Sequence, residues 1–184
     1  TPTDDNIYDA TSNETATIAI SGVSGGSASE SGTQSVTITI TDNESAPTVT
    51  LATSGTSIAE NSGSTLTITA TLSVATYQDV TVSIGSSGTA TEGTDYGTVS
   101  DITISAGSTT GTATFDPTDD SAETDTVTAT LAITGVSGGS ASESGSQSVT
   151  ISILDDESVP RVTLSVSASS IAENAGSSLT LTAT

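Results

Sequence analysis

The chain has 184 residues, and 22 acidic residues stand against a single basic one, which gives a formal net charge of −21. Nucleic acids and anionic membranes are bound through Lys and Arg, so this balance excludes both as partners. No run of residues approaches the ~20 apolar positions of a membrane-spanning helix. The chain also has no Cys, His or Lys to act as nucleophile or general base. Only a glycosidase-like pair of carboxylates remains, and three Tyr and one Phe are too few for the aromatic platform of such a cleft, so the composition argues against an enzyme.

Short segments of alternating apolar and polar residues follow one another along the chain. Before residue 47, for example, Val36, Ile38 and Ile40 alternate with threonines. Such period-2 alternation of β-branched residues is typical of strands with one buried face. From residue 47 onward it predicts seven strands, near 48–53 with a continuation at 57–60, and near 65–73, 79–85, 98–105, 110–116, 126–134 and 146–155. Seven short antiparallel strands predict an all-β Greek-key sandwich, with Phe115 and Tyr96 as candidates for the large core residues.

A long internal repeat indicates the domain organisation. Residues 22–71 recur as residues 135–184, at an offset of 113 residues and with about three-quarters of the positions identical. A period of this length corresponds to a whole domain. Pro47 and Pro160, which each follow an acidic run, mark the boundaries. We therefore expect the C-terminal part of one module at 1–46, a complete module at 47–159 and the N-terminal part of the next at 160–184, as in an excerpt from a tandem array.

The acidic residues of the complete module collect on one side of the predicted topology. In a seven-strand Greek-key sandwich, the connections after the first, third and fifth strands and the end of the seventh strand lie at one tip. No Lys or Arg falls in these four segments to neutralise them. The tip contains eleven carboxylates, namely Glu60, Glu92, Asp95, Asp116, Asp119, Asp120, Glu123, Asp125, Asp155, Asp156 and Glu157. Glu30, Asp79, Asp101 and Glu143 lie outside it, and we assign them no ligand role.

Converging carboxylates need compensation. Two of them ~4 Å apart repel by about 1 kcal/mol even in the dielectric of water. A hard divalent cation offsets this repulsion, and calcium takes about 6–8 oxygen ligands. The alternative interpretation is that acidic loops only keep the surface soluble. Clustering over four segments without a basic partner favours the metal, so the sequence predicts calcium binding at this tip.

Several motifs resemble those of Calx-beta domains. They are SIAENSG at 57–63, GTATEGTDY at 88–96, ISAGSTTGTATF at 104–115, DDSAETD at 119–125 and VTISILDDE at 149–157. The resemblance extends over the complete module and both partial ones. It implies a seven-stranded sandwich that binds calcium at the acidic tip, near the junction with the next module.

The resemblance also implies particular ligand positions. In the complete module these are Glu60, Asp95, Asp119, Asp120, Glu123, Asp155 and Asp156, and in the partial modules they are Asp4, Asp5, Asp42 and Glu173. Two departures from the family pattern predict fewer ions or weaker binding. Asp125 is followed by Thr126 in place of a second Glu, and Asn43 stands where the second copy has Asp156.

These observations favour a structural repeat of a secreted or cell-surface fibre, stalk or adhesin, stiffened by calcium between adjacent modules of the same chain. A glycan- or protein-binding module is an alternative, although recognition surfaces favour Tyr, Trp and Arg, which are scarce here. Another alternative is the protomer of an extracellular filament built from like chains. In that case residues 1–46 would offer the last two strands of a module, and residues 160–184 would offer the first two. The third and fourth strands would be missing from both ends.

Overall fold

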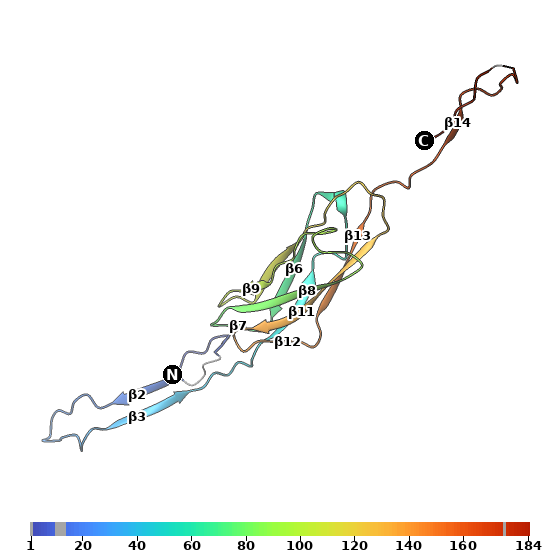
Figure 1. Cartoon of the computed structure of the whole chain (residues 1–184). Coiled ribbons are helices and arrows are strands. Elements are labelled where there is room, and N and C mark those ends of the chain that lie inside the picture. The colour runs from blue at the N-terminus through green and yellow to red at the C-terminus, as the bar shows by residue number, and fades with distance from the viewer. Residues whose placement is uncertain (1, 10–13, 175) are drawn as a thin grey trace.

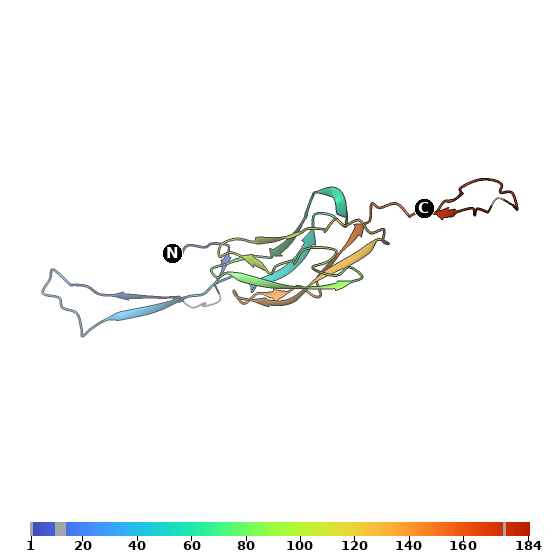
Figure 2. The ribbon, with the colours of Figure 1, turned by 45° about the horizontal axis from the view of Figure 1, so that its top comes forward.

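The computed structural model describes residues 2–9, 14–174 and 176–184, and strands dominate its regular structure. The complete module lies in the middle of an elongated molecule (Figure 1). Strands β2 (Glu14–Ala19) and β3 (Ser35–Ile40) project from one end, and β14 (Leu164–Val166) and β15 (Leu181–Ala183) project from the other. A second view shows the same row of three parts (Figure 2). Among the described residues, no helix has the length and apolar character needed to cross a membrane.

Two sheets form the complete module, which confirms the predicted all-β sandwich. The first sheet has the order β10 (Thr110–Phe115), β6 (Leu66–Leu72), β4 (Thr48–Thr53) and β12 (Ser142–Glu143). The second has the order β5 (Ser57–Ala59), β13 (Ser148–Leu154), β11 (Val127–Ser137), β8 (Val80–Gly88) and β9 (Ile102–Ile104). The long ladders are antiparallel, whereas the short strands β12 and β5 pair in parallel with β4 and β13.

The first predicted strand is divided between the two sheets. Its main part, β4, pairs with β6, and its continuation, β5, crosses to the edge of the other sheet beside β13. A turn makes the crossing, in which the Thr53 hydroxyl donates to the Gly55 carbonyl at 2.9 Å. The short 3₁₀ helix η1 (Glu60–Ser62) follows β5 directly. The crossing matters for function because it delivers Glu60 to the end of β13.

The core lies between the sheets, as the alternation predicts. Val, Ile, Leu and Ala side chains from both sheets are buried there, and the two large members are Tyr96 and Phe115. Their rings stack with centroids 4.8 Å apart. Tyr96 belongs to the β8–β9 connection and Phe115 ends β10, so the stack ties the β8–β9 connection to the start of the β10–β11 connection. Backbone hydrogen bonds from Gly97 N to Asp116 O at 2.9 Å and from Thr118 N to Asp95 O at 3.0 Å join the same two loops.

Several predicted strands differ in length from those observed. The strand expected over 98–105 is reduced to β9, and the strand expected to end at residue 85 continues as β8 to Gly88. Gly88 has φ 121°, and a Cβ there would meet the Thr128 carbonyl oxygen at 2.1 Å. Only glycine therefore lets β8 run this close to β11.

The flanking strands repeat the pairing of the complete module. The β2–β3 pair sets Thr17 opposite Thr37, and the matching β11–β13 pair sets Thr130 opposite Thr150. In both pairs the two threonine hydroxyl oxygens lie 3.0 Å apart. Ile18, by contrast, is 62% exposed, because no second sheet covers β2 and β3 in the described part of the chain. The repeat is thus a structural one, and its strand register is preserved.

Candidate metal site

Glu60 is placed by the parallel pairing of β5 with β13. In this pairing Ile58 lies opposite Ile153 and Ala59 lies opposite Leu154. Both Ile58 and Ile153 are buried, so core packing fixes the register. The next residue on each strand is acidic, and Glu60 therefore emerges beside the run that begins at Asp155. Two segments far apart in sequence thus meet at one tip.

Three carboxylates gather at this tip, and we call Glu60, Asp156 and Glu157 the carboxylate cluster. Each offers one oxygen, and these oxygens all lie within 4.8 Å of one another. Oε1 of Glu60 and Oε2 of Glu157 are buried and have no hydrogen-bond partner among the described residues. A buried acceptor without a donor costs about 1–3 kcal/mol, and more when it is charged. The cluster therefore presents oxygens that a cation could satisfy.

The electrostatics of the cluster agree with this geometry. The pKa of Glu60 is raised to about 7, first by burial and then by its side-by-side contact with the Glu157 carboxyl. The negative charges of Asp155 and Asp120 raise the Glu60 pKa further. Burial also raises the pKa of Glu157, whereas its contact with Glu60 lowers it. Without a cation, the two carboxyls therefore disfavour being charged together, and Glu60 gains a proton as the pH falls through about 7.

Neighbouring groups orient the carboxylates around the cluster. The Asn61 side-chain amide donates to Oδ2 of Asp156. The Thr124 backbone N–H and hydroxyl both donate to Oδ1 of Asp155, at 3.1 and 3.2 Å. Because Thr124 lies in the β10–β11 connection, these bonds hold that connection against the end of β13. Three of the four acidic segments expected at the tip therefore contribute to one place.

The structure separates the other predicted ligands of the complete module from the cluster. Asp95 accepts from the Thr91 backbone N–H at 2.6 Å and so closes its own loop. Asp120 accepts from the Ala122 backbone N–H at 2.6 Å and lies near enough to raise the Glu60 pKa. Asp119 and Glu123 are exposed, and neither belongs to the cluster.

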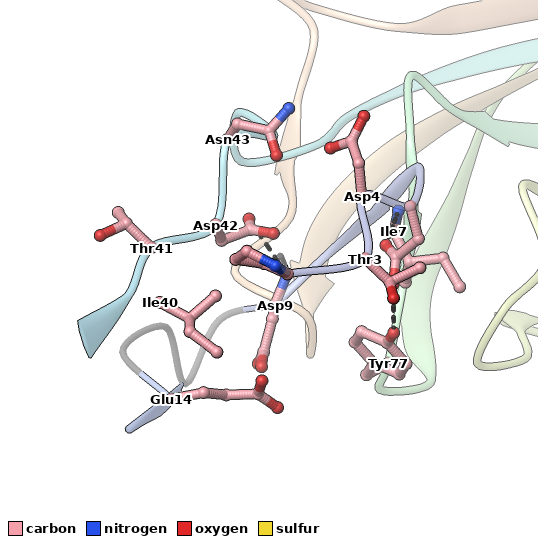
Figure 3. A pocket seen from close by; sticks show the side chains of 12 residues that line it. Thr3, Asp4, Ile7, Asp9, Glu14, Ile40, Thr41, Asp42, Asn43 and Tyr77 are labelled. Atoms are coloured by element: carbon pink, nitrogen blue, oxygen red, sulfur yellow. Dashed lines mark hydrogen bonds between the residues drawn. The ribbon is translucent and has the colours of Figure 1, made fainter. Parts of the chain in front are cut away.

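The predicted ligands of the partial modules occupy other places. Asp4, Asp5 and Asp42 line a hollow of about 320 Å³ beside the complete module (Figure 3). Oδ2 of Asp42 accepts there from the Asp9 backbone N–H at 3.4 Å. Glu173 lies exposed in the last segment.

The sequence placed Glu157 at the acidic tip but not among the ligand positions, and it did not single out Asn61. The residue pattern contained a signal for Glu157, because the in–out alternation of β13 continues past its end. Ile153 is buried, Asp155 and Glu157 are partly buried, and Leu154 and Asp156 between them are exposed. Extending the period-2 pattern through the acidic run would have placed Glu157 on the inward side. No sequence signal points to Asn61, because its contact depends on the fold of η1.

The acidic residues outside the tip have structural partners. Asp79 accepts from the Ala106 backbone N–H at 2.8 Å, and Asp101 accepts from the Ile84 backbone N–H at 3.0 Å. Glu143 accepts from the Gln147 backbone N–H. These three carboxylates satisfy backbone donors and hold loops.

Several solved structures are similar to this chain in fold. The apo form of the Calx CBD1 domain is similar at 18% identity over 59% of this chain and 98% of that chain, with a TM-score of 0.49. CBD12 from CALX1.2 is similar at 20% identity over 54% of this chain and 41% of that chain, with a TM-score of 0.47. A two-domain protein of unknown function from Bacteroides fragilis NCTC 9343 is similar at 9% identity over 66% of this chain and 55% of that chain, with a TM-score of 0.45. No protein-family model and no curated protein matches the chain. These likenesses concern the fold alone.

Proposed function

We propose that this chain is a structural repeat of a secreted or cell-surface fibre, stalk or adhesin, in which calcium binds at the acidic tip of each module and stiffens the joint to the next. The observation that carries the proposal is the pair of buried carboxylate oxygens in Glu60 and Glu157 that have no hydrogen-bond partner among the described residues. A polar group that folding removes from water needs a partner. A calcium ion would supply one for both oxygens at once.

The residues around the carboxylate cluster fit a hard cation. Glu60, Asp156 and Glu157 offer oxygens to a common point, and Asp155 and Asp120 add negative charge nearby. Calcium prefers carboxylate and carbonyl oxygens. When bound, the ion would supply two positive charges that offset the repulsion between Glu60 and Glu157. The Asn61 amide, which donates to Asp156, would keep that carboxylate in place beside the ion.

The position of the cluster supports a role at the joint. It follows the end of β13 directly, and only Ser158 and Val159 separate it from Pro160, where the next copy of the repeat begins. An ion that ties η1 to the residues after β13 would immobilise the start of this short linker. The proposed setting is outside the cell, where calcium-binding modules have Kd values of about 0.1–1 mM.

The proposed role is mechanical, and we infer no catalysis. The sequence has no His, Cys or Lys, so acid–base or nucleophilic chemistry would fall to carboxylates alone. The Asn61 amide holds Asp156, and the oxygens of the cluster lie within 4.8 Å of one another. That arrangement suits ion binding better than proton transfer to a substrate.

Thermal unfolding of the chain in EDTA, calcium and magnesium tests the proposal. At a calcium concentration of about one to ten times Kd, mass action adds about 0.4–1.4 kcal/mol per site to the free energy of unfolding. We expect a higher melting temperature in millimolar calcium than in EDTA, and a smaller effect of magnesium, which needs stricter octahedral geometry. Equal melting temperatures in EDTA and calcium would overturn the proposal.

A further inference from the structure

The connection between β10 and β11 has a counterpart in the first copy of the repeat, where the same turn leads to a different contact. In the complete module, Oδ1 of Asp120 accepts from the backbone N–H two residues later, at 2.6 Å. In the first copy, Oδ1 of Asp5 accepts from the Ile7 backbone N–H at 2.9 Å. The turn therefore belongs to the repeat. In the first copy the turn is followed by Ile7 and Tyr8, and these two residues contact the complete module.

These two residues form β1 (Ile7–Tyr8) and add to the complete module as a short parallel strand. Their partners are β7 (Ala75–Thr76), with Ile7 opposite Ala75 and Tyr8 opposite Thr76. The pairing joins the two modules through their backbones, which is the mode of recognition that extended segments use on an exposed strand edge.

The complete module holds the receiving strand rigidly. Ala75 and Thr76 are both buried. The Gly107 backbone N–H donates to the Thr76 carbonyl at 2.7 Å, and the Thr76 hydroxyl donates to the Gln78 carbonyl at 2.5 Å. A strand fixed by its own module loses little conformational freedom when a second strand pairs with it.

A side-chain contact follows β7 immediately. The Tyr77 hydroxyl donates to Oδ2 of Asp5 at 2.7 Å (Figure 3). Hydrogen bonds to a charged acceptor are the stronger kind. Both carboxylate oxygens of Asp5 are therefore engaged, one by the turn in its own module and one by the neighbouring module.

We propose that residues 5–8 and 75–77 form a latch through which the complete module docks onto the module that precedes it, and that this latch closes without a cation. The covalent linker through Pro47 is one point of attachment between the modules, and the latch is a second. Two separate points of attachment restrict rotation at the joint, whereas one does not. The latch uses Asp5, a predicted ligand of the preceding module, but neither Glu60 nor Glu157, so it is separate from the carboxylate cluster of the complete module.

Hydrogen–deuterium exchange of the 184-residue chain in EDTA tests the latch. We expect the peptide spanning 5–9 to be protected in the unaltered chain. The Tyr77→Phe and Asp5→Asn variants should each exchange there about tenfold faster, as expected for the loss of one net hydrogen bond. Asp4→Asn is the matched control, because the neighbouring Asp4 takes part neither in the Asp5 hydrogen bonds nor in the strand pairing that form the latch. Peptides from β11 should be unchanged in all three variants, which shows that the module remains folded.

Two results would overturn the latch: exchange at residues 5–9 that neither Tyr77→Phe nor Asp5→Asn accelerates, or protection of residues 5–9 that is absent in EDTA and present in calcium. The second result would leave the calcium proposal intact, so the two failures are distinguishable.

Discussion

Replacing Glu60 with Gln should stabilise the calcium-free protein and abolish its response to calcium. In the absence of a cation, the ionised Glu60 carboxylate faces Glu157 in a partly buried setting, and its pKa is about 7 instead of 4.5. Because the folded-state pKa lies above the unfolded value, the folded chain binds more protons between these two pH values. Its stability therefore falls as pH rises through that window. A neutral Gln removes the cost of ionisation, and its amide can donate to Glu157.

The size of the effect follows from the same pKa. A rise from 4.5 to about 7 corresponds to about 3 kcal/mol between the two protonation states. Glu60 is partly exposed, and solvent screening reduces the gain from Glu60→Gln to about 1 kcal/mol above pH 7. For a module of this size, that gain raises the melting temperature by about 4 °C. The gain should disappear near pH 4.5, where Glu60 of the folded protein is already protonated.

Thermal unfolding in EDTA at pH 8 measures the gain in stability of Glu60→Gln, and the same measurement at pH 4.5 shows whether the gain disappears. Thermal unfolding in calcium at pH 8 measures the loss of the response to calcium. Glu92→Gln is the matched control, because Glu92 is an exposed tip acid that accepts from the Ser86 hydroxyl at 2.7 Å, a bond that Gln can keep. We expect Glu92→Gln to behave like the unaltered chain throughout. The reasoning is refuted if Glu60→Gln lowers stability in EDTA at pH 8, or if calcium stabilises it as much as it stabilises the unaltered chain.

Three further predictions concern the core and the joint. Phe115→Ala should lower the free energy of unfolding by about 3–5 kcal/mol in urea titrations, because it empties the space beside Tyr96, and a loss below about 1 kcal/mol would contradict the stacked core. Trypsin should cut the folded chain after the exposed Arg161, more slowly in calcium than in EDTA, and equal rates would argue against an ordered joint. In small-angle scattering, calcium should reduce the flexibility of the unaltered chain, and Asp155→Asn combined with Asp156→Asn should keep the calcium-free profile. Identical profiles of the unaltered chain with and without calcium would show that the ion does not clamp the joint.

The sequence by itself determined the local features of this protein. Period-2 alternation marks a strand and its inward face wherever one side is apolar, so it identified the sandwich and the buried Phe115 without knowledge of the partners. The repeat likewise preserves strand register, as the equivalent pairs Thr17–Thr37 and Thr130–Thr150 show. Alternation is a property of each segment alone, which is why these features could be inferred without the fold.

The tertiary structure decided which acidic residues meet. Topology predicted that eleven carboxylates share one tip, but only Glu60, Asp156 and Glu157 bring oxygens together. That choice depends on β5 leaving the sheet of β4 and pairing with β13, and no local pattern encodes a change of sheet. The contact between Tyr77 and Asp5 likewise depends on how two modules sit together. Pairings between segments distant in sequence are fixed by the packing of a common core, and this packing exists only in the folded chain.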